Sequence, residues 1–184
     1  MAEPGTVQEH IALVRSLRAV RHFRSEPVPD QALADILDVA RWSGSAKNSQ
    51  PWEFIVIRDR DTLAALAALD GFVKHLAGAQ VAIVLVMAGE NAEGETFDEG
   101  RLSERIGLAA AAHELGSYIG WFAGEARSAA KQLLGIPEQR LVRTAISLGY
   151  PDEVAHHARP KPAQARRPLS ELVHQERYTV RADA

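Results

Sequence analysis

The stretch SGSAKNSQPWEFIVI, residues 43–57, decides the fold class because it joins a polar loop to an apolar strand. Its first half is dense in Ser, Gly and Asn and ends at Pro51, a composition typical of loops. Its second half, EFIVI, is short, apolar and rich in β-branched residues, which is typical of a strand. The stretch therefore predicts a polar loop that leads directly into the core.

Helical patterns flank this strand in the sequence. Before it, apolar residues at helical spacing predict a helix over 31–42, with Asp30 expected as its N-cap. After it, a second helix is expected over about 60–69. The run VAIVLVMA at 81–88 is apolar at every position, so it predicts a central strand covered on both faces.

The rest of the chain continues to alternate between helices and strands. Apolar residues at three-to-four spacing predict a helix over 6–17, and an alanine-rich helix is expected over 102–115. A further helix near 125–134 and a buried strand at 141–151 complete the pattern. Between them, residues 89–100 are acidic and contain several glycines, so we expect a mobile loop there.

Length and composition favour one domain and exclude several classes of protein. The chain has 184 residues, 46% of them hydrophobic, which predicts a single domain over 1–184 with one sizeable core. A net charge of −3 argues against a nucleic-acid binder, and the absence of cysteine excludes thiolate chemistry. The acidic N-terminus lacks signal-peptide features and no apolar run could span a membrane, so we expect a soluble, cytoplasmic protein.

The segment 152–184 lacks a core pattern of its own. It is polar, proline-rich and basic through Arg167, with a short apolar element at 169–173. A stretch of this kind is either disordered or packed against something else, such as a neighbouring subunit.

A first polar cluster follows the N-terminal helix. If helical geometry persists, Arg18 and Arg21 lie close together, and Arg24 is a further basic residue nearby. Paired guanidinium groups suit a phosphate monoester. The alternative interpretation is a solvated basic face at the end of a helix.

A second cluster, SAKNSQPW at 45–52, lies in the polar loop. The side-chain amides of Asn48 and Gln50 each present a donor and an acceptor, which matches the edge of a heterocycle. Ser45 adds a hydroxyl and Trp52 an apolar wall. The alternative is an ordinary loop whose polar side chains satisfy backbone groups.

A third cluster, LGSYIGWF at 115–122, contains Gly116 and Gly120 around a short β-rich stretch. Glycines at these positions permit close approach of the backbone to a flat ligand, whereas a helix terminator is the commoner explanation.

Taken together, five segments resemble the nitroreductase family of FMN-dependent oxidoreductases in their order and spacing. The resemblance covers about residues 14–178, and its most specific part is an Arg-x-x-Arg-x-Phe opening followed by Ser-x-x-Asn-x-Gln-Pro-Trp. The segments are LRAVRHFRSEPV, SGSAKNSQPWEFIVI, LAAAAHELGSYIG, LLGIPEQRLVRTAISLGYP and RRPLSELVH.

The resemblance implies an α+β fold, with a central mixed sheet flanked by helices. It also implies a homodimer whose FMN sites lie at the interface, with the C-terminal extension, 152–184, exchanged across it. No nucleic acid or membrane is implied as a partner.

Cofactor contacts follow from matching positions with the family. In one chain they fall on Arg18, Ala19 and Arg21, and in the other chain on Ser45, Ala46 and Asn48. The resemblance places Ile119, Gly120 and Trp121 along the flavin near N5, and Lys74 at its N1 and O2 side. It assigns Arg166 or Arg167 to the phosphate.

The sequence departs from the family pattern at two positions. Ala19 stands where serine is common and removes a hydroxyl contact, and Gly44 replaces a proline and loosens the loop. Two charge-assisted arginine bonds, at about 1.5 to 3 kcal/mol each, outweigh one neutral bond of about 0.5 to 1.5 kcal/mol. The site is therefore expected to be retained with a lower affinity.

The implied activity is the transfer of a hydride from NAD(P)H to FMN and then of electrons to a nitroaromatic, quinone or related acceptor, with ping-pong kinetics and no protein general acid. Two alternatives remain open: a flavin-sequestering protein whose stacking face is blocked, and a biosynthetic FMN-dependent dehydrogenase. The adjacent residues His156 and His157 have no third ligand at a matching spacing, so no metal site is expected. Asp98 and Glu99 are expected in a solvated turn.

Overall fold

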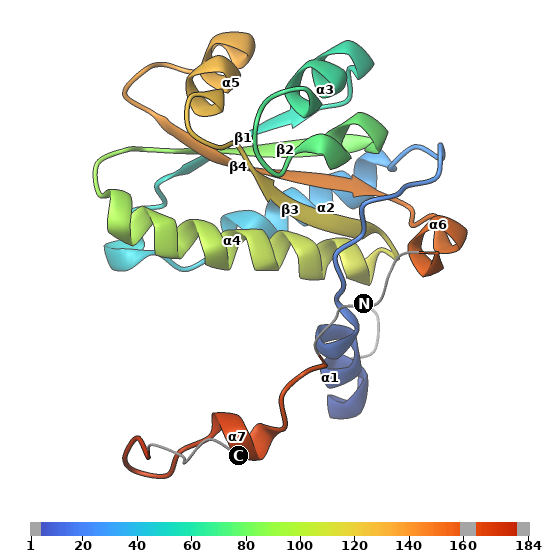
Figure 1. Ribbon diagram of the computed structural model, residues 1–184, viewed down its shortest axis with the longest axis vertical. Coiled ribbons are helices and arrows are strands. Elements are labelled where there is room, and N and C mark those ends of the chain that lie inside the picture. Colours follow the sequence, from blue (N-terminus) through green and yellow to red (C-terminus); the bar gives the residue numbers. More distant parts are fainter. Residues whose placement is uncertain (1–4, 159–164, 180–184) are drawn as a thin grey trace.

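The computed structural model, which describes residues 5–158 and 165–179, contains one four-stranded sheet (Figure 1). The strand order is β1-β2-β4-β3, and every neighbouring pair is antiparallel. Parallel pairing occurs as an isolated bridge between Ala19 and Ser117. The predicted α+β class with a helix-flanked sheet is confirmed, but the sheet of the described residues is antiparallel rather than mixed. The strands are β1 (Trp52–Ile57), β2 (Val81–Met87), β3 (Gly116–Trp121) and β4 (Leu141–Gly149).

Helices cover both faces of this sheet, as Figure 1 shows, with α2 and α4 on one face and α3, α5 and η2 on the other. The α-helices are α1 (Val7–Ser16), α2 (Asp30–Arg41), α3 (Arg60–Ala67), α4 (Ala92–Ala112), α5 (Ala126–Leu134), α6 (Glu153–His157) and α7 (Leu169–Leu172). Two 3-10 helices are η1 (Ala46–Asn48) and η2 (Lys74–Gly78).

The core divides into two apolar clusters, one on each face of the sheet. In β2, Ile83 and Leu85 pack toward α2 and α4, whereas Val84 and Val86 pack toward the opposite layer. All seven residues of β2 are buried, because successive side chains of a strand point to opposite faces and both faces are covered. The prediction of a central strand at 81–88 is confirmed.

The expectation of a mobile loop over 89–100 and of a helix beginning near 102 is wrong. One helix, α4, runs from Ala92 to Ala112, and Glu95, Asp98 and Glu99 are buried. The carboxylate of Glu95 accepts backbone N–H groups of Gly89, Glu90 and Asn91 at 2.8, 2.9 and 3.0 Å. These bonds tie the preceding turn to the helix.

The expectation that Asp98 and Glu99 lie in a solvated turn is also wrong, because both are buried residues of α4. Glu99 forms an ion pair with Arg143 of β4, and Asp98 pairs with Arg101 at 3.3 Å. A buried charge requires such a partner, and the partner of Glu99 is distant in the sequence. Local composition therefore misses this burial.

The sequence predicts Asp30 as the N-cap of α2, and this prediction is wrong. Pro29 holds the cap position without a side-chain bond, and Asp30 is the first helical residue. There its carboxylate accepts from Arg58 at 2.8 Å, linking α2 to the residue after β1.

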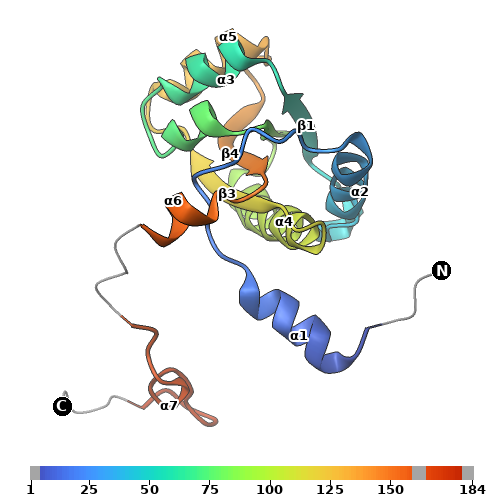
Figure 2. The same cartoon turned by 90° about the vertical axis from the view of Figure 1, so that its right-hand side faces the viewer.

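The two ends of the described chain project from the body. In Figure 2, α1 and α7 extend away from the layers that contain the sheet. The apolar stripe of α1 faces solvent: Val7, Ile11 and Val14 are exposed. The predicted arm at 152–184 contains α6 and α7, and its residues 159–164 and 180–184 lie outside the described part, as do 1–4 at the N-terminus.

Candidate functional site

A cavity of about 630 Å³ lies where α1, α4 and β3 meet. It combines basic side chains with an apolar wall and small residues. Its lining is Val14, Arg15, Leu17, Arg18, Ala19, Glu104, Gly107, Ser117, Tyr118, Ile119 and Arg166. We call it the arginine cavity.

Three arginine residues line the arginine cavity: Arg15, Arg18 and Arg166. Arg18 turns back on the end of α1, where its Nη1 donates to the carbonyls of Arg15 and Leu17 at 2.7 and 2.8 Å. These bonds use one nitrogen of the group and fix its position. The described lining holds one carboxylate, that of Glu104, so the cavity is suited to an anion.

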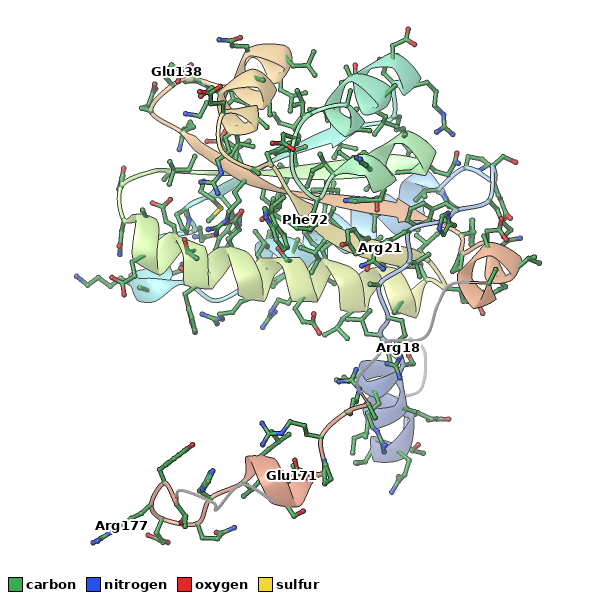
Figure 3. The ribbon with its side chains drawn as sticks, viewed as in Figure 1. Arg18, Arg21, Phe72, Glu138, Glu171 and Arg177 are labelled. Atoms are coloured by element: carbon green, nitrogen blue, oxygen red, sulfur yellow. The ribbon has the colours of Figure 1, made fainter. Side chains whose placement is uncertain are left out.

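Arg18 and Arg21 do not share a helical face, because α1 ends at Ser16. In the extended segment that follows, side chains three positions apart point in opposite directions. Arg21 instead places its guanidinium carbon 3.9 Å from the centre of the Tyr118 ring on β3. Figure 3 shows Arg18 at the top of α1 and Arg21 above it, against the sheet.

β3 is an edge strand whose outer side is covered only at its ends in the described chain. At one end, Val20 N donates to Ser117 O at 2.8 Å; at the other, Phe72 N donates to Trp121 O at 2.9 Å. Ile119 lies midway and has the same outward direction, because backbone groups alternate along a strand. No described segment pairs with its backbone N–H and carbonyl, so both are available to a ligand with a polar edge.

Behind this edge, Gly120 makes room for a buried histidine. A Cβ at this position would collide with His75 Nε2 and with the carbonyl oxygen of Phe72. The close approach that the sequence predicts for this glycine is therefore to the protein's own backbone. His75 packs edge-on against Tyr118 at 4.4 Å, and burial lowers its pKa to about 4, so the ring is neutral at pH 7.

The loop before β1 holds an uncommon backbone conformation. Lys47, Asn48 and Gln50 have φ angles of 53°, 56° and 49°, in the left-handed region that non-glycine residues seldom adopt. Ser45 Oγ stabilises the turn by accepting from Gln50 N at 2.9 Å. Such strain concentrates at functional sites, and it leaves the side chains of Asn48 and Gln50 exposed.

This loop borders a second hollow, separate from the arginine cavity. Ser45 and Ala46 line it together with the N-terminal half of α4 and Arg101. The two hollows take different residues of α4: Gly94 and Arg101 line this one, and Glu104 and Gly107 line the arginine cavity. The described chain thus carries two hollows with no lining residue in common, and we call the second one the loop half-site.

The departure at Gly44 has a structural consequence in the loop half-site. A Cβ at Gly44 would collide with the guanidinium of Arg101. The space that the glycine leaves is thus taken by an arginine, which fills the loop half-site rather than loosening it.

The remaining candidates are divided. Of the two arginines in the arm, Arg166 lines the arginine cavity, whereas Arg167 pairs with Glu171 at 3.2 Å. Lys74 begins η2 and is exposed, and it lines neither half-site. Trp121 is exposed at the end of β3. Whether these residues bind a cofactor stays a prediction.

Four functional candidates escaped the sequence reasoning. Arg15 and Glu104 line the arginine cavity, Arg101 lines the loop half-site, and His75 supports Gly120 from behind. Only Arg15 has a local signal, its spacing of three from Arg18. Among residues 5–158 and 165–179 the side chains form no group of three metal ligands, the side chains of His156 and His157 not being described.

Sequence comparison identifies the family. A model of the nitroreductase family matches residues 14–80, which contain the segments of Arg18 and of the 45–50 loop. A protein of Archaeoglobus fulgidus named "Putative NADH dehydrogenase/NAD(P)H nitroreductase" is 34% identical over 154 residues, covering 80% of this chain and 88% of that protein. The chain belongs to the nitroreductase family. A protein of the same name from Methanothermobacter thermautotrophicus is 30% identical, with 76% of each chain covered.

Solved structures of nitroreductases agree with this fold. An "FMN-dependent Nitroreductase" from Clostridium difficile R20291 superposes with a TM-score of 0.77 at 25% identity, covering 91% of this chain and 99% of that one. A "putative nitroreductase in complex with FMN" from Desulfovibrio desulfuricans gives a TM-score of 0.72 at 29% identity, with 92% and 97% covered. No helix within the described ranges is long and apolar enough to cross a membrane.

Proposed function

We propose that the protein is an FMN-dependent oxidoreductase that takes a hydride from NAD(P)H and reduces nitroaromatic, quinone or related electron-poor acceptors. The observation that carries this proposal is the arginine cavity, whose lining combines three arginine residues with Ile119 of the open β3 edge. A phosphate and a heterocycle edge are both provided for, and FMN has both.

The residues of the arginine cavity fit the phosphate end of FMN. Arg18 is held by two backbone carbonyls, so little side-chain freedom remains to be lost on binding. Arg15 and Arg166 add two more donors that suit a phosphate. The carboxylate of Glu104 is an acceptor for the hydroxyls of a ribityl chain.

The ring end is held by β3 and by a cation. Ile119 offers an outward N–H and carbonyl to the polar edge of the isoalloxazine, and Gly120 and Trp121 continue that wall. Arg21, fixed over Tyr118 at 3.9 Å, supplies positive charge beside it without reorganisation. Lys74, which lines neither half-site, is kept as a second candidate cation on the basis of the family resemblance. When bound, FMN supplies the redox chemistry, accepting a hydride equivalent and passing electrons on.

The functional unit is proposed to be a homodimer in which the loop half-site of one chain completes the arginine cavity of the other. Ser45 and Ala46 line the loop half-site and not the arginine cavity of their own chain, so the proposal has them, with Asn48 and Gln50 of the same loop, act on the arginine cavity of the partner. The exposed apolar stripe of α1 and the arm that carries α7 are suited to burial against a second copy.

The proposed kinetic scheme is ping-pong, with donor and acceptor using one stacking face in turn. The proposed scheme requires no proton donor from the protein, because solvent supplies the protons. The nicotinamide-containing cytoplasm is the compartment that fits this activity.

The purified protein should be yellow and release FMN on heating. Under anaerobic conditions, addition of NADH or NADPH should abolish the flavin absorption band, and a nitroaromatic or quinone should restore it. A bound flavin that neither nucleotide reduces would favour the sequestering alternative, and a colourless protein that does not bind FMN would overturn the proposal.

The assembly is tested separately by light scattering coupled to gel filtration. The mass should be twice 20.1 kDa, and Ile11→Glu, which places a charge on the exposed stripe of α1, should shift the population toward the monomer. A monomer that binds FMN at full affinity would contradict the shared site.

A further inference from the structure

Phe72 and Trp121 form an exposed aromatic pair next to the open edge of β3. Their ring centroids are 4.6 Å apart with an interplanar angle of 49°, and the residues are 57% and 43% exposed. Two large aromatic residues in contact with each other and with solvent form an apolar patch that usually marks a binding surface.

The backbone holds this pair rigidly. Gly71 forms a bridge with Phe122, Phe72 N donates to Trp121 O at 2.9 Å, and Ala123 N donates to Asp70 O at 3.1 Å. Phe72 and Trp121 are therefore directly opposed across two short extended segments, which places their side chains on one face. A preformed surface loses little entropy when a ligand packs on it.

The position of the pair relates it to the proposed site. Along β3, Ile119 and Trp121 are two positions apart and share a face, and Ile119 also lines the arginine cavity. The open edge thus begins at the arginine cavity and ends at the aromatic pair.

We propose that the Phe72–Trp121 pair is the surface against which the electron acceptor packs, and that it selects flat aromatic acceptors over non-aromatic ones. This inference rests on the proposed function. An aromatic acceptor matches the pair because tilted and offset aromatic contacts are favourable, and because electron-poor rings attract the electron-rich indole of Trp121. A compact anionic acceptor gains nothing from these rings.

The test isolates the second half of the reaction. FMN-loaded protein is reduced with a stoichiometric amount of dithionite, so that no nicotinamide competes for the surface, and is mixed in a stopped-flow instrument with a p-nitrobenzoate ester or with ferricyanide. The variants are Phe72→Leu, which keeps an apolar side chain without the ring, and Trp121→Leu. Phe72→Tyr keeps the ring, and Leu133→Ala removes an exposed apolar side chain on α5 as a matched control.

We expect the leucine variants to raise the half-saturating concentration of the nitroaromatic about tenfold, which corresponds to about 1.4 kcal/mol. In Phe72→Leu, ferricyanide reduction and FMN affinity should be unchanged, and Phe72→Tyr and Leu133→Ala should behave as the unaltered protein. Trp121→Leu is compared at saturating FMN, because Trp121 also belongs to the wall proposed for the flavin. An unchanged dependence on the nitroaromatic would overturn the inference.

Other outcomes are equally decisive. Loss of FMN from Phe72→Leu and Trp121→Leu alike would assign the pair to the cofactor rather than to the acceptor and overturn the inference. Iodide quenching of tryptophan fluorescence, compared between the unaltered holoenzyme and Trp121→Leu, tests whether Trp121 is exposed when FMN is bound. Equal quenching of the two would mean that Trp121 is buried and would also overturn the inference. Failure of the unaltered protein to bind FMN would instead refute the proposed function, so the two failures are distinguishable.

Discussion

His75 Nδ1 lies 2.8 Å from Ser147 Oγ, and this contact joins η2 to the buried strand β4. Burial lowers the pKa of His75 to about 4 from its usual 6.5. A hydrogen bond to the backbone of Phe72 raises this pKa, and the positive charge of Arg21 lowers it further. The neutral ring is thus part of the folded structure, directly behind Gly120.

This burial predicts a loss of stability in mild acid. The unfolded chain binds a proton at His75 below about pH 6.5, whereas the folded chain does so only near pH 4. The stabilisation of the folded state by the neutral His75 is complete above pH 6.5. This stabilisation falls by about 2 kcal/mol at pH 5 and is lost near pH 4. Urea unfolding at pH 7.5 and 5 should show this difference, and His75→Gln should reduce it. The exposed His22→Gln serves as control; an equal pH response in all three proteins would refute the prediction.

Glu95 should contribute more to the unfolding free energy than the neighbouring acid Glu90, and this contribution should be lost at low pH. Burial raises its pKa, but the N–H groups of Asn91, Gly89 and Glu90 together lower it more, so the folded state favours the carboxylate. Its stabilisation is present above the ordinary pKa of 4.5 and is lost as the pH falls below it. Glu95→Gln removes the charge from three bonds and should cost about 2 to 4 kcal/mol in unfolding free energy at pH 7.

The matched control is Glu90→Gln, at an exposed position in the same turn whose backbone, not side chain, contacts Glu95. Chemical denaturation should show little change for it, within about 0.5 kcal/mol. Equal losses in the two variants would mean that net charge, not the three hydrogen bonds, is responsible.

Gly71 should tolerate no side chain. Its φ of 123° is in a region that favours glycine, and a Cβ there would collide with the carbonyl oxygen of Trp121. Gly71→Ala should lower the unfolding free energy by about 1 to 3 kcal/mol. Gly78→Ala, in η2 with nothing within 4 Å of a Cβ, should be neutral or slightly stabilising. Thermal unfolding of the pair checks the difference, and equal melting temperatures would contradict it.

Arg18 should contribute to FMN affinity through its charge. Arg18→Gln removes one charge-assisted contact to the proposed phosphate and should weaken FMN binding by about 10- to 100-fold, with little effect on riboflavin, which lacks the phosphate. Fluorescence titration of the flavin measures both. Arg41→Gln, at an exposed arginine paired with Asp38 on α2, is the control. A loss of riboflavin affinity equal to that of FMN would show that Arg18 does not act on the phosphate.

The regular elements of the fold could be predicted from the sequence, because their signals are local. The run at 81–88 is apolar throughout, and the helix of 31–42 presents a periodic stripe. Residues 89–100 could not be predicted, since the acids there are stabilised by N–H groups of a turn and by Arg143, far along the chain. Composition alone cannot reveal a partner that only the folded chain brings near.

The candidate site shows the same division. Arg18, Ala19, Ile119 and Arg166, which the sequence resemblance assigns to the cofactor, line one cavity, and their role in FMN binding stays a prediction. Arg21 does not lie beside Arg18 on a helical face, because α1 ends at Ser16. His75 carried no motif at all; it is recognisable only from its burial behind Gly120.

The arginine cavity and the loop half-site share no lining residue within the described part of one chain. If two chains share each flavin, then FMN binding and dimerisation are thermodynamically linked. Dilution alone should therefore release FMN from the protein. The yellow colour of a sample would then report its concentration as well as its purity.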